Sequence, residues 1–208
     1  MFKDRKEAGN LLASELSYLK DNSVIVAIPR GGVVIGAEVA KELKLPLTII
    51  VPRKIGAPDN PELAIGAVAG EGSTFLNERI IKTLGVTNEY LTEEIRHQVE
   101  EIKRREKSYL RGKKSLSVED KIAILVDDGL ATGATATVAV RALKEQNPEK
   151  VILAVPVAPE ESKLMLGKEA DEVIVLQTPA MFYAVGQFYQ FFEQTTDEEV
   201  KDLLEEFN

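Results

Sequence analysis

The fold is decided by the stretch Ile122-Ala-Ile-Leu-Val-Asp127-Asp128-Gly129-Leu-Ala-Thr132-Gly133-Ala-Thr135. Its first five residues are apolar and predict a buried parallel strand. Two adjacent carboxylates follow where that strand ends, then a loop of small residues, and then a helix that begins at about Gly133. This order predicts a site for a phosphorylated sugar, because carboxylates accept hydrogen bonds from vicinal hydroxyls and a helix N-terminus favours a phosphate.

The two acids, Asp127 and Asp128, also have a simpler interpretation. Adjacent side chains of a strand point to opposite faces, so an acidic pair inside a core would be costly. At a strand end before Gly129 the chain can turn, and both carboxylates can reach one ligand. The alternative, which stays open, is a helix N-cap beside a solvated acid.

Similar apolar runs recur along the chain and alternate with amphipathic patterns. The expected strands are Val24–Ile28, Leu47–Val51, Ala64–Ala69, Ile122–Val126, Val151–Val155 and Val173–Leu176. The expected helices are Arg5–Lys20, Val34–Leu43, Glu78–Leu84, Glu89–Leu110, Thr135–Gln146, Glu160–Gly167 and Asp197–Phe207. This alternation predicts an α/β fold with a mostly parallel twisted sheet flanked by helices.

Loops after parallel strands meet at one edge of the sheet, because crossover connections are right-handed, and open α/β sheets bind their ligands at that edge. The loops expected there are Pro29–Gly32, Pro52–Lys54, Asp127–Thr135 and Pro156–Pro159. We therefore expect acids, glycines and cations to lie close together.

The stretch from 88 to 114 predicts a long helix inserted before the acidic strand. Its apolar stripe is narrow, and Lys103–Lys114 holds seven basic residues and one acid, Glu106. The simpler interpretation is a solvated amphipathic helix that packs on the domain or on a second subunit. The functional alternative is a mobile basic cover over a phosphate-rich site.

The C-terminal part is aromatic-rich: half of the chain's 7 Phe and 5 Tyr lie between Phe182 and Phe192. This density predicts a small separate unit. We divide the chain into an α/β core, residues 1–176, with the helical insertion at about 88–114, and a C-terminal tail, residues 177–208.

The amino-acid composition limits the classes of partner that we expect this protein to bind. The chain has 208 residues, 44% of them hydrophobic, and a net charge of −8, which argues against general nucleic-acid binding. No apolar run could span a bilayer, and the first residues lack a signal-peptide core. The absence of cysteine excludes disulfides and thiolate chemistry. We expect a cytoplasmic protein without membrane contact.

The residues Asp127–Thr135 resemble the phosphoribosyl-pyrophosphate (PRPP) binding motif of type I phosphoribosyltransferases. Walker and dinucleotide-binding glycine patterns are absent from this loop. The order of elements from about residue 5 to 176 also resembles that fold, and the tail resembles its variable hood. The N-terminal residues Phe2–Gly9 and the segment Pro179–Val200 resemble a subgroup of stand-alone phosphoribosyltransferases with an undefined substrate.

The resemblance implies a role for each site residue. It implies that Asp127, Asp128 and Arg30 are catalytic, and that the two acids hold the ribose 2′- and 3′-hydroxyls. The implied ribose-5-phosphate ligands are Asp127, Asp128, Ala131, Thr132, Gly133, Ala134 and Thr135. The implied pyrophosphate ligands are Arg30, Gly31, Gly32, Arg53 and Lys54. The family's loop that corresponds to Arg30–Gly32 often carries a cis non-proline peptide at its second residue.

Several of these assignments keep simpler alternatives. Arg30–Gly32 could be an ordinary glycine turn, and Arg53-Lys54 a plain surface turn. Phe182, Tyr183 and Phe188 are candidates to stack on a flat base, and the alternative is that they form the hood's own core.

The function implied by the resemblance is transfer of 5-phosphoribosyl from PRPP to a nucleobase or similar nitrogenous acceptor, with release of pyrophosphate. Mg²⁺ is the implied cofactor, touching Asp127 and Asp128 directly or through ribose hydroxyls or water, and a homodimer is the implied assembly. Ala131 disfavours the hypoxanthine- and guanine-type subgroup, which has an aspartate there. The alternatives are a PRPP-sensing regulator without catalysis and a different phosphate-ester enzyme on the same kind of sheet.

Overall fold

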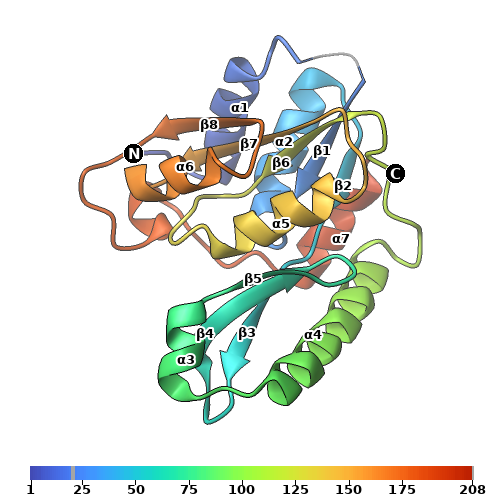
Figure 1. Ribbon diagram of the computed structural model, residues 1–208. Coiled ribbons are helices and arrows are strands. Elements are labelled where there is room, and N and C mark those ends of the chain that lie inside the picture. The colour runs from blue at the N-terminus through green and yellow to red at the C-terminus, as the bar shows by residue number, and fades with distance from the viewer. Residues whose placement is uncertain (20–21, 208) are drawn as a thin grey trace.

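The computed structural model describes residues 1–19 and 22–207. Its main sheet has five parallel strands in the order β2-β1-β6-β7-β8 (Figure 1). The strands are β1 (Ser23–Ala27), β2 (Leu47–Ile49), β6 (Ile122–Val126), β7 (Lys150–Val157) and β8 (Glu172–Gln177). The predicted α/β class and mostly parallel sheet are confirmed.

Helices cover both faces of this sheet (Figure 1). They are α1 (Arg5–Glu15) and α2 (Gly31–Leu43) on one face, and α5 (Ala134–Lys144) and α6 (Glu160–Leu166) on the other. Alternate side chains of β1 separate the two cores: Ile25 and Ala27 face α1 and α2, whereas Val24 and Val26 face α5. Burial on both faces explains the continuous apolar runs of the central strands β1, β6 and β7.

A second, antiparallel sheet follows β2 and lies below the main sheet in Figure 1. It contains β3 (Arg53–Ala57), β4 (Asn60–Ala69) and β5 (Ser73–Leu76), followed by α3 (Glu78–Leu84) and α4 (Asn88–Tyr109). The predicted strand Ala64–Ala69 is confirmed as part of β4, but it lies in this antiparallel sheet and not in the parallel one, and β3 and β5 were not predicted. A parallel strand needs a long crossover, whereas only a tight turn separates β3 from β4.

The long helix is confirmed, since α4 begins at Asn88 and ends at Tyr109, but residues 110–114 are not helical. Several other boundaries also differ from the prediction, those of α1 and α2 by the most among the helices. Helix α1 ends at Glu15, and the predicted end at Lys20 lies outside the described residues. Helix α2 begins at Gly31, three residues before Val34, so the second and third residues of the Arg30-Gly31-Gly32 loop already belong to its first turn.

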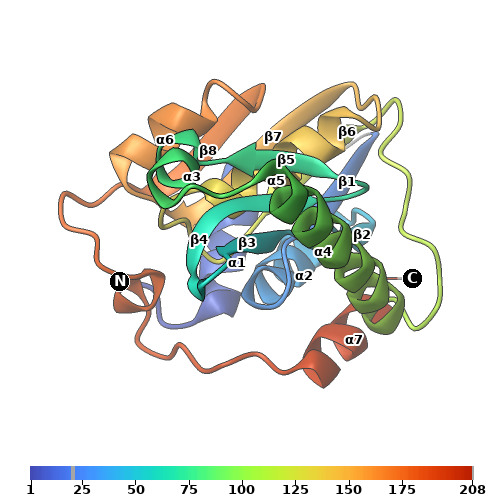
Figure 2. The same cartoon turned by 60° about the horizontal axis from the view of Figure 1, so that its bottom comes forward.

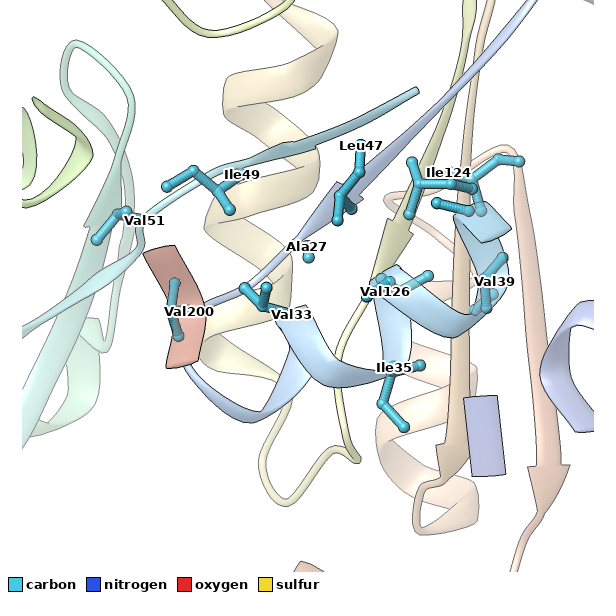
Figure 3. Close-up of a cluster of buried hydrophobic side chains, with 14 of the residues drawn as sticks. Ala27, Val33, Ile35, Val39, Leu47, Ile49, Val51, Ile124, Val126 and Val200 are labelled. Atoms are coloured by element: carbon cyan, nitrogen blue, oxygen red, sulfur yellow. The ribbon is translucent and has the colours of Figure 1, made fainter. Parts of the chain in front are cut away.

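The C-terminal tail returns along the α2 side of the molecule (Figure 2). It holds a short 3-10 helix, Val185–Phe188, and the predicted acidic helix, α7 (Asp197–Glu205). Val200 of α7 is fully buried and lies beside Val33 of α2 and Val51 (Figure 3). The tail is thereby anchored in the same core as the parallel sheet. Across the described residues, every helix is too short or too polar to span a lipid bilayer.

Candidate active site

The acidic pair lies where β6 ends. Asp127 Oδ1 accepts a hydrogen bond of 2.8 Å from the backbone N–H of Asp128, so the chain turns between the two residues. Burial raises the pKa of Asp127 well above its usual range, and the neighbouring Asp128 raises it further. Burial also raises the pKa of Asp128, although Arg5 opposes this shift. Both carboxyls are therefore sheltered acceptors, as a site for sugar hydroxyls requires.

Arg5, the first residue of α1, lies directly on this pair. Its Nε donates to Asp128 Oδ2 over 2.8 Å, and its Nη1 donates to the carbonyl of Glu193 over 2.7 Å. The guanidinium also covers the ring of Phe192, 3.8 Å from the ring centroid. Arg5 therefore joins the acidic pair to the C-terminal tail, and only 12% of its side chain is exposed.

The glycine loop, Arg30–Gly32, packs against the acidic pair. A Cβ on Gly32 would lie 2.9 Å from Asp127 Cα, and a Cβ on Gly31 would collide with the carboxylate of Asp128. Only glycine allows the loop to come this close to the two acids. The glycine loop and the acidic pair, which were predicted separately, are therefore in contact. A cis peptide bond joins Pro29 to Arg30, at the first residue of the loop rather than the expected second.

In the threonine loop, Ala131–Thr135, the residues Ala131, Thr132 and Thr135 are exposed, whereas Ala134 is half-buried and Gly133 is buried. Gly133 has a φ of +73°, and a Cβ there would lie 2.8 Å from Met165 Cε, so the turn into α5 requires glycine. The first amides of a helix have no acceptor within the helix. A hydrogen bond holds the backbone of Ala131 in place, because its carbonyl accepts from Ser162 Oγ over 2.6 Å. The loop therefore offers free donors to an anion.

The basic side chains that were predicted to bind pyrophosphate line one cavity of about 280 Å³, which we call the cationic cavity. Arg30, Arg53 and Lys54 line it, and so does Arg105 of α4. Arg53 and Lys54 begin β3 and do not form the expected strand-end loop. Lys54 forms an ion pair of 2.8 Å with Glu62, and 46% of its side chain is exposed.

The three candidate base-stacking residues do not gather at the acidic pair. The rings of Phe182 and Phe188 pack on each other with centroids 5.1 Å apart, whereas Tyr183 is 84% exposed. Their neighbour Tyr189 reaches the site instead, because its hydroxyl donates to the carbonyl of Asp128 over 2.6 Å. Val185 of the same segment packs against Gly129.

Sequence reasoning missed four residues that the structure brings to this site: Arg5, Arg105, Tyr189 and Asp197. Each belongs to a segment far along the chain from its partner, so no local motif marks it. The aromatic density near Tyr189 and the basic run that holds Arg105 were the available signals.

The described residues contain no cluster of three or more metal-ligating side chains. The acidic pair supplies two carboxyls, and one of them already binds Arg5. Mg²⁺ commonly binds proteins through one or two carboxylates while keeping waters and substrate phosphates as its other ligands. The pair fits an ion that arrives with a phosphorylated substrate, and it does not form a complete metal site by itself.

Comparison with known proteins agrees with this geometry. The profile of the phosphoribosyl transferase domain matches residues 5–190, which include the acidic pair, the glycine loop and the threonine loop. The chain belongs to the phosphoribosyl transferase family. Two Mycobacterium tuberculosis proteins, each named "putative phosphoribosyl transferase", are 41% identical to it over 206 residues. The match covers 99% of this chain and 46% of each relative, so the chain spans about half their length.

Solved structures of phosphoribosyl transferases and similar proteins share the fold. The crystal structure of TT1426 from Thermus thermophilus covers all of this chain, and 99% of that chain is matched, with a TM-score of 0.84 and 38% identity. The purine phosphoribosyltransferase from Pyrococcus horikoshii matches 92% of this chain and 91% of its own, with a TM-score of 0.50 and 14% identity. The second likeness shows the fold alone.

Proposed function

We propose that this phosphoribosyl transferase family member transfers the 5-phosphoribosyl group of PRPP to a nucleobase or similar nitrogenous acceptor and releases pyrophosphate. The observation that carries the proposal is the contact of Gly31 and Gly32 with the acidic pair. This contact places the loop that would bind pyrophosphate against the carboxyls that would accept from the ribose hydroxyls, and the loop into α5 follows the same carboxyls in the chain.

Each part has a physical role in this reaction. Asp127 and Asp128 would accept hydrogen bonds from the ribose 2′- and 3′-hydroxyls. The amides of the threonine loop would bind the 5-phosphate, which the α5 dipole favours. Arg30 and Arg53 would bind the pyrophosphate with charge-assisted hydrogen bonds.

The reaction needs positioning and charge stabilisation rather than a protein nucleophile. The bond between ribose C1 and the pyrophosphate oxygen breaks, and its electron pair leaves with the oxygen. The acceptor nitrogen supplies the pair for the new C1–N bond, and the proton that this nitrogen carries passes to water or to the leaving pyrophosphate. Arginines at the leaving pyrophosphate would stabilise the charge that develops there, so the proposed transfer would need no cysteine.

Mg²⁺ is part of the proposal, and Asp127 and Asp128 are the residues that would hold it, directly or through ribose hydroxyls or water. When bound, it would neutralise charge on the leaving group. A homodimer, a cytoplasmic location and a place in nucleotide metabolism also belong to the proposal, on the strength of the family alone.

The test is calorimetry with PRPP and Mg²⁺, followed by an assay of pyrophosphate release over a panel of nucleobases. We expect PRPP to bind and the double variant Asp127→Asn, Asp128→Asn to lose binding. Failure of the wild-type protein to bind PRPP, or equal binding by the double variant, would contradict the proposal.

One observation favours a second candidate, a PRPP-sensing protein without catalysis. The three candidate base-stacking residues are not arranged as one stacking surface: Phe182 and Phe188 pack on each other, and Tyr183 is 84% exposed. A sensor would bind PRPP as tightly as an enzyme but release no pyrophosphate with any base. The same panel therefore separates the two functions.

A further inference from the structure

The cationic cavity joins three parts of the chain that are distant in sequence. Arg30 comes from the loop after β1, and Arg53 and Lys54 come from the start of β3. The opposite wall comes from α4, through Arg105 and Tyr109, and from the first residue of α7, Asp197. Figure 2 shows α4 and α7 close together on the side of the molecule where α2 lies.

Arg53 and Arg105 each use only part of their N–H donors in the hydrogen bonds of the described residues. Arg53 uses Nε for a 2.8 Å hydrogen bond to Gln98, and Arg105 uses Nε for a 2.8 Å hydrogen bond to Glu101. Within residues 1–19 and 22–207, no acceptor is found for the terminal nitrogens of either guanidinium. Burial lowers the pKa of Arg53, and the nearby charge of Arg105 lowers it further. The cavity therefore presents unused N–H groups in a positive field.

One carboxylate of the chain itself, that of Asp197, lies among the positive charges of the cationic cavity. Tyr109 donates its hydroxyl hydrogen bond to Asp197 Oδ1 over 2.9 Å, and the same oxygen lies 3.7 Å from Arg30 Nη1. Among the described residues that line the cavity, Asp197 is the only carboxylate. An anionic oxygen is thus already present beside the arginine that the glycine loop supplies.

We propose that Arg105 is a further pyrophosphate-binding residue and that Asp197 competes with pyrophosphate for Arg30. The inference rests on the proposed function, because it extends the pyrophosphate site across the cavity to α4. Arginine suits this role, since its fork binds two phosphate oxygens at once. Of the basic residues of α4 between Lys103 and Lys107, Arg105 then contributes to the site, whereas Lys103, Arg104 and Lys107 are exposed.

The helix supplies its own matched control. Arg104 and Arg105 are adjacent and both pair with Glu101, at 2.7 Å and 2.8 Å. Arg104 is 68% exposed and does not line the cavity, whereas Arg105 is 39% exposed and does. Loss of either arginine removes one positive charge and one ion pair with Glu101, so a difference between the variants reports contact with the ligand.

The experiment titrates inorganic pyrophosphate, with Mg²⁺ in excess, into the wild-type protein and the variants Arg105→Gln, Arg104→Gln and Asp197→Asn. Loss of a charge-assisted hydrogen bond should weaken binding about tenfold in Arg105→Gln, and Arg104→Gln should stay within about twofold of wild type. Asp197→Asn should bind more tightly than wild type. Arg105→Lys should lie between wild type and Arg105→Gln, because it keeps the charge without the fork.

Thermal unfolding of each variant shows whether it is folded, and Arg105→Lys replaces Arg105→Gln if the latter is not. Equal affinities for Arg105→Gln and Arg104→Gln, or an Asp197→Asn variant no tighter than wild type, would overturn the inference. If PRPP binds through the acidic pair while these variants behave alike, only this inference fails. If wild type binds neither PRPP nor pyrophosphate, the proposed function fails with it.

Discussion

Arg5 and Asp128 are 123 positions apart in the sequence, yet Arg5 Nε donates to Asp128 Oδ2 over 2.8 Å. This ion pair is largely buried, with 12% and 16% of the two side chains exposed. It brings the first turn of α1 into the candidate active site. It also leaves Asp128 with one carboxylate oxygen, Oδ1, that Arg5 does not contact.

The ion pair should show a large coupling energy. Hydrogen bonds to charged groups contribute about 1.5–3 kcal/mol, and a double-mutant cycle isolates that contribution. We expect denaturant unfolding of Arg5→Gln, Asp128→Asn and their combination to give a coupling energy in this range. The control cycle pairs Lys6→Gln with Asp128→Asn, because Lys6 is the exposed neighbour of Arg5. Equal coupling in both cycles would contradict the prediction.

The glycine loop should not tolerate a methyl group. A Cβ on Gly32 would lie 2.9 Å from Asp127 Cα, which is backbone and cannot move aside cheaply. Overpacking of this kind costs about 1–3 kcal/mol, so Gly32→Ala should lower the free energy of unfolding and weaken PRPP binding.

Gly167→Ala is the matched control for that variant. Its Cβ would meet only the carbonyl oxygens of Lys163 and Leu164, at 3.4 and 3.6 Å, and its φ is −63°. Such a site favours alanine by about 0.4–1 kcal/mol, because the unfolded chain loses freedom. The two substitutions should therefore shift stability in opposite directions, and a Gly32→Ala variant as stable as wild type would refute the prediction.

Tyr189→Phe should damage the site without removing a large side chain. The Tyr189 hydroxyl donates to the carbonyl of Asp128 over 2.6 Å, and burial raises the pKa of the phenol, so it remains a donor. Leaving that buried carbonyl without a partner costs about 1–3 kcal/mol. We expect a lower melting temperature and weaker PRPP binding. Tyr18→Phe removes a hydroxyl that donates to Glu172 at the surface, and it should change neither by much.

The ion pair between Arg141 of α5 and Glu169 should lose its contribution to stability at acid pH. Glu169 accepts hydrogen bonds of 3.0 and 2.6 Å from Arg141, which also donates to the carbonyl of Thr74 in β5. The hydrogen bonds from Arg141, more than its charge, lower the pKa of Glu169 below its usual 4.5. The interaction therefore contributes its full stability above pH 4.5 and loses it as the pH falls through the folded-state pKa.

Comparison of wild type with Glu169→Gln measures this contribution. Because 39% of the Arg141 side chain is exposed, solvent screening limits the difference at pH 7 to about 1 kcal/mol. The difference should shrink steadily below pH 4.5. Glu161→Gln, at an exposed position of α6, is the control. A difference that stayed constant down to pH 3 would show that the carboxylate's charge is not involved.

The main sheet could be predicted from the sequence because its strands are buried on both faces. Runs such as Ile122–Val126 then stand out as apolar throughout. The second sheet could not be predicted, since its strands are only partly buried: the first half of β4 is exposed, and β3 begins with the partly exposed Arg53 and the exposed Lys54. An apolar run such as Ala64–Ala69 also carries no information about the direction of its neighbour, which depends on the connecting turns.

The candidate site likewise has a part that could be predicted from the sequence and a part that could not. The acidic pair and the glycine loop could be predicted because short local patterns specify them, and the structure brings them into contact. Tyr189 and Asp197 could not be predicted, because their partners lie 61 and 88 positions away. The sequence directed attention to the aromatics Phe182, Tyr183 and Phe188, whereas the residue that touches the site is the next one along. The PRPP and base assignments stay predictions.

The backbone near residue 2 is joined to the backbone near residue 190. Phe2 donates to the carbonyl of Phe188 over 2.7 Å, and Gln190 donates to the carbonyl of Phe2 over 2.8 Å. Contacts between segments so far apart in sequence close the largest loop and form late in folding. The support for Asp128, which needs both Arg5 and Tyr189, depends on that closure. During refolding, PRPP binding should therefore appear after the circular-dichroism signal of the parallel sheet has recovered.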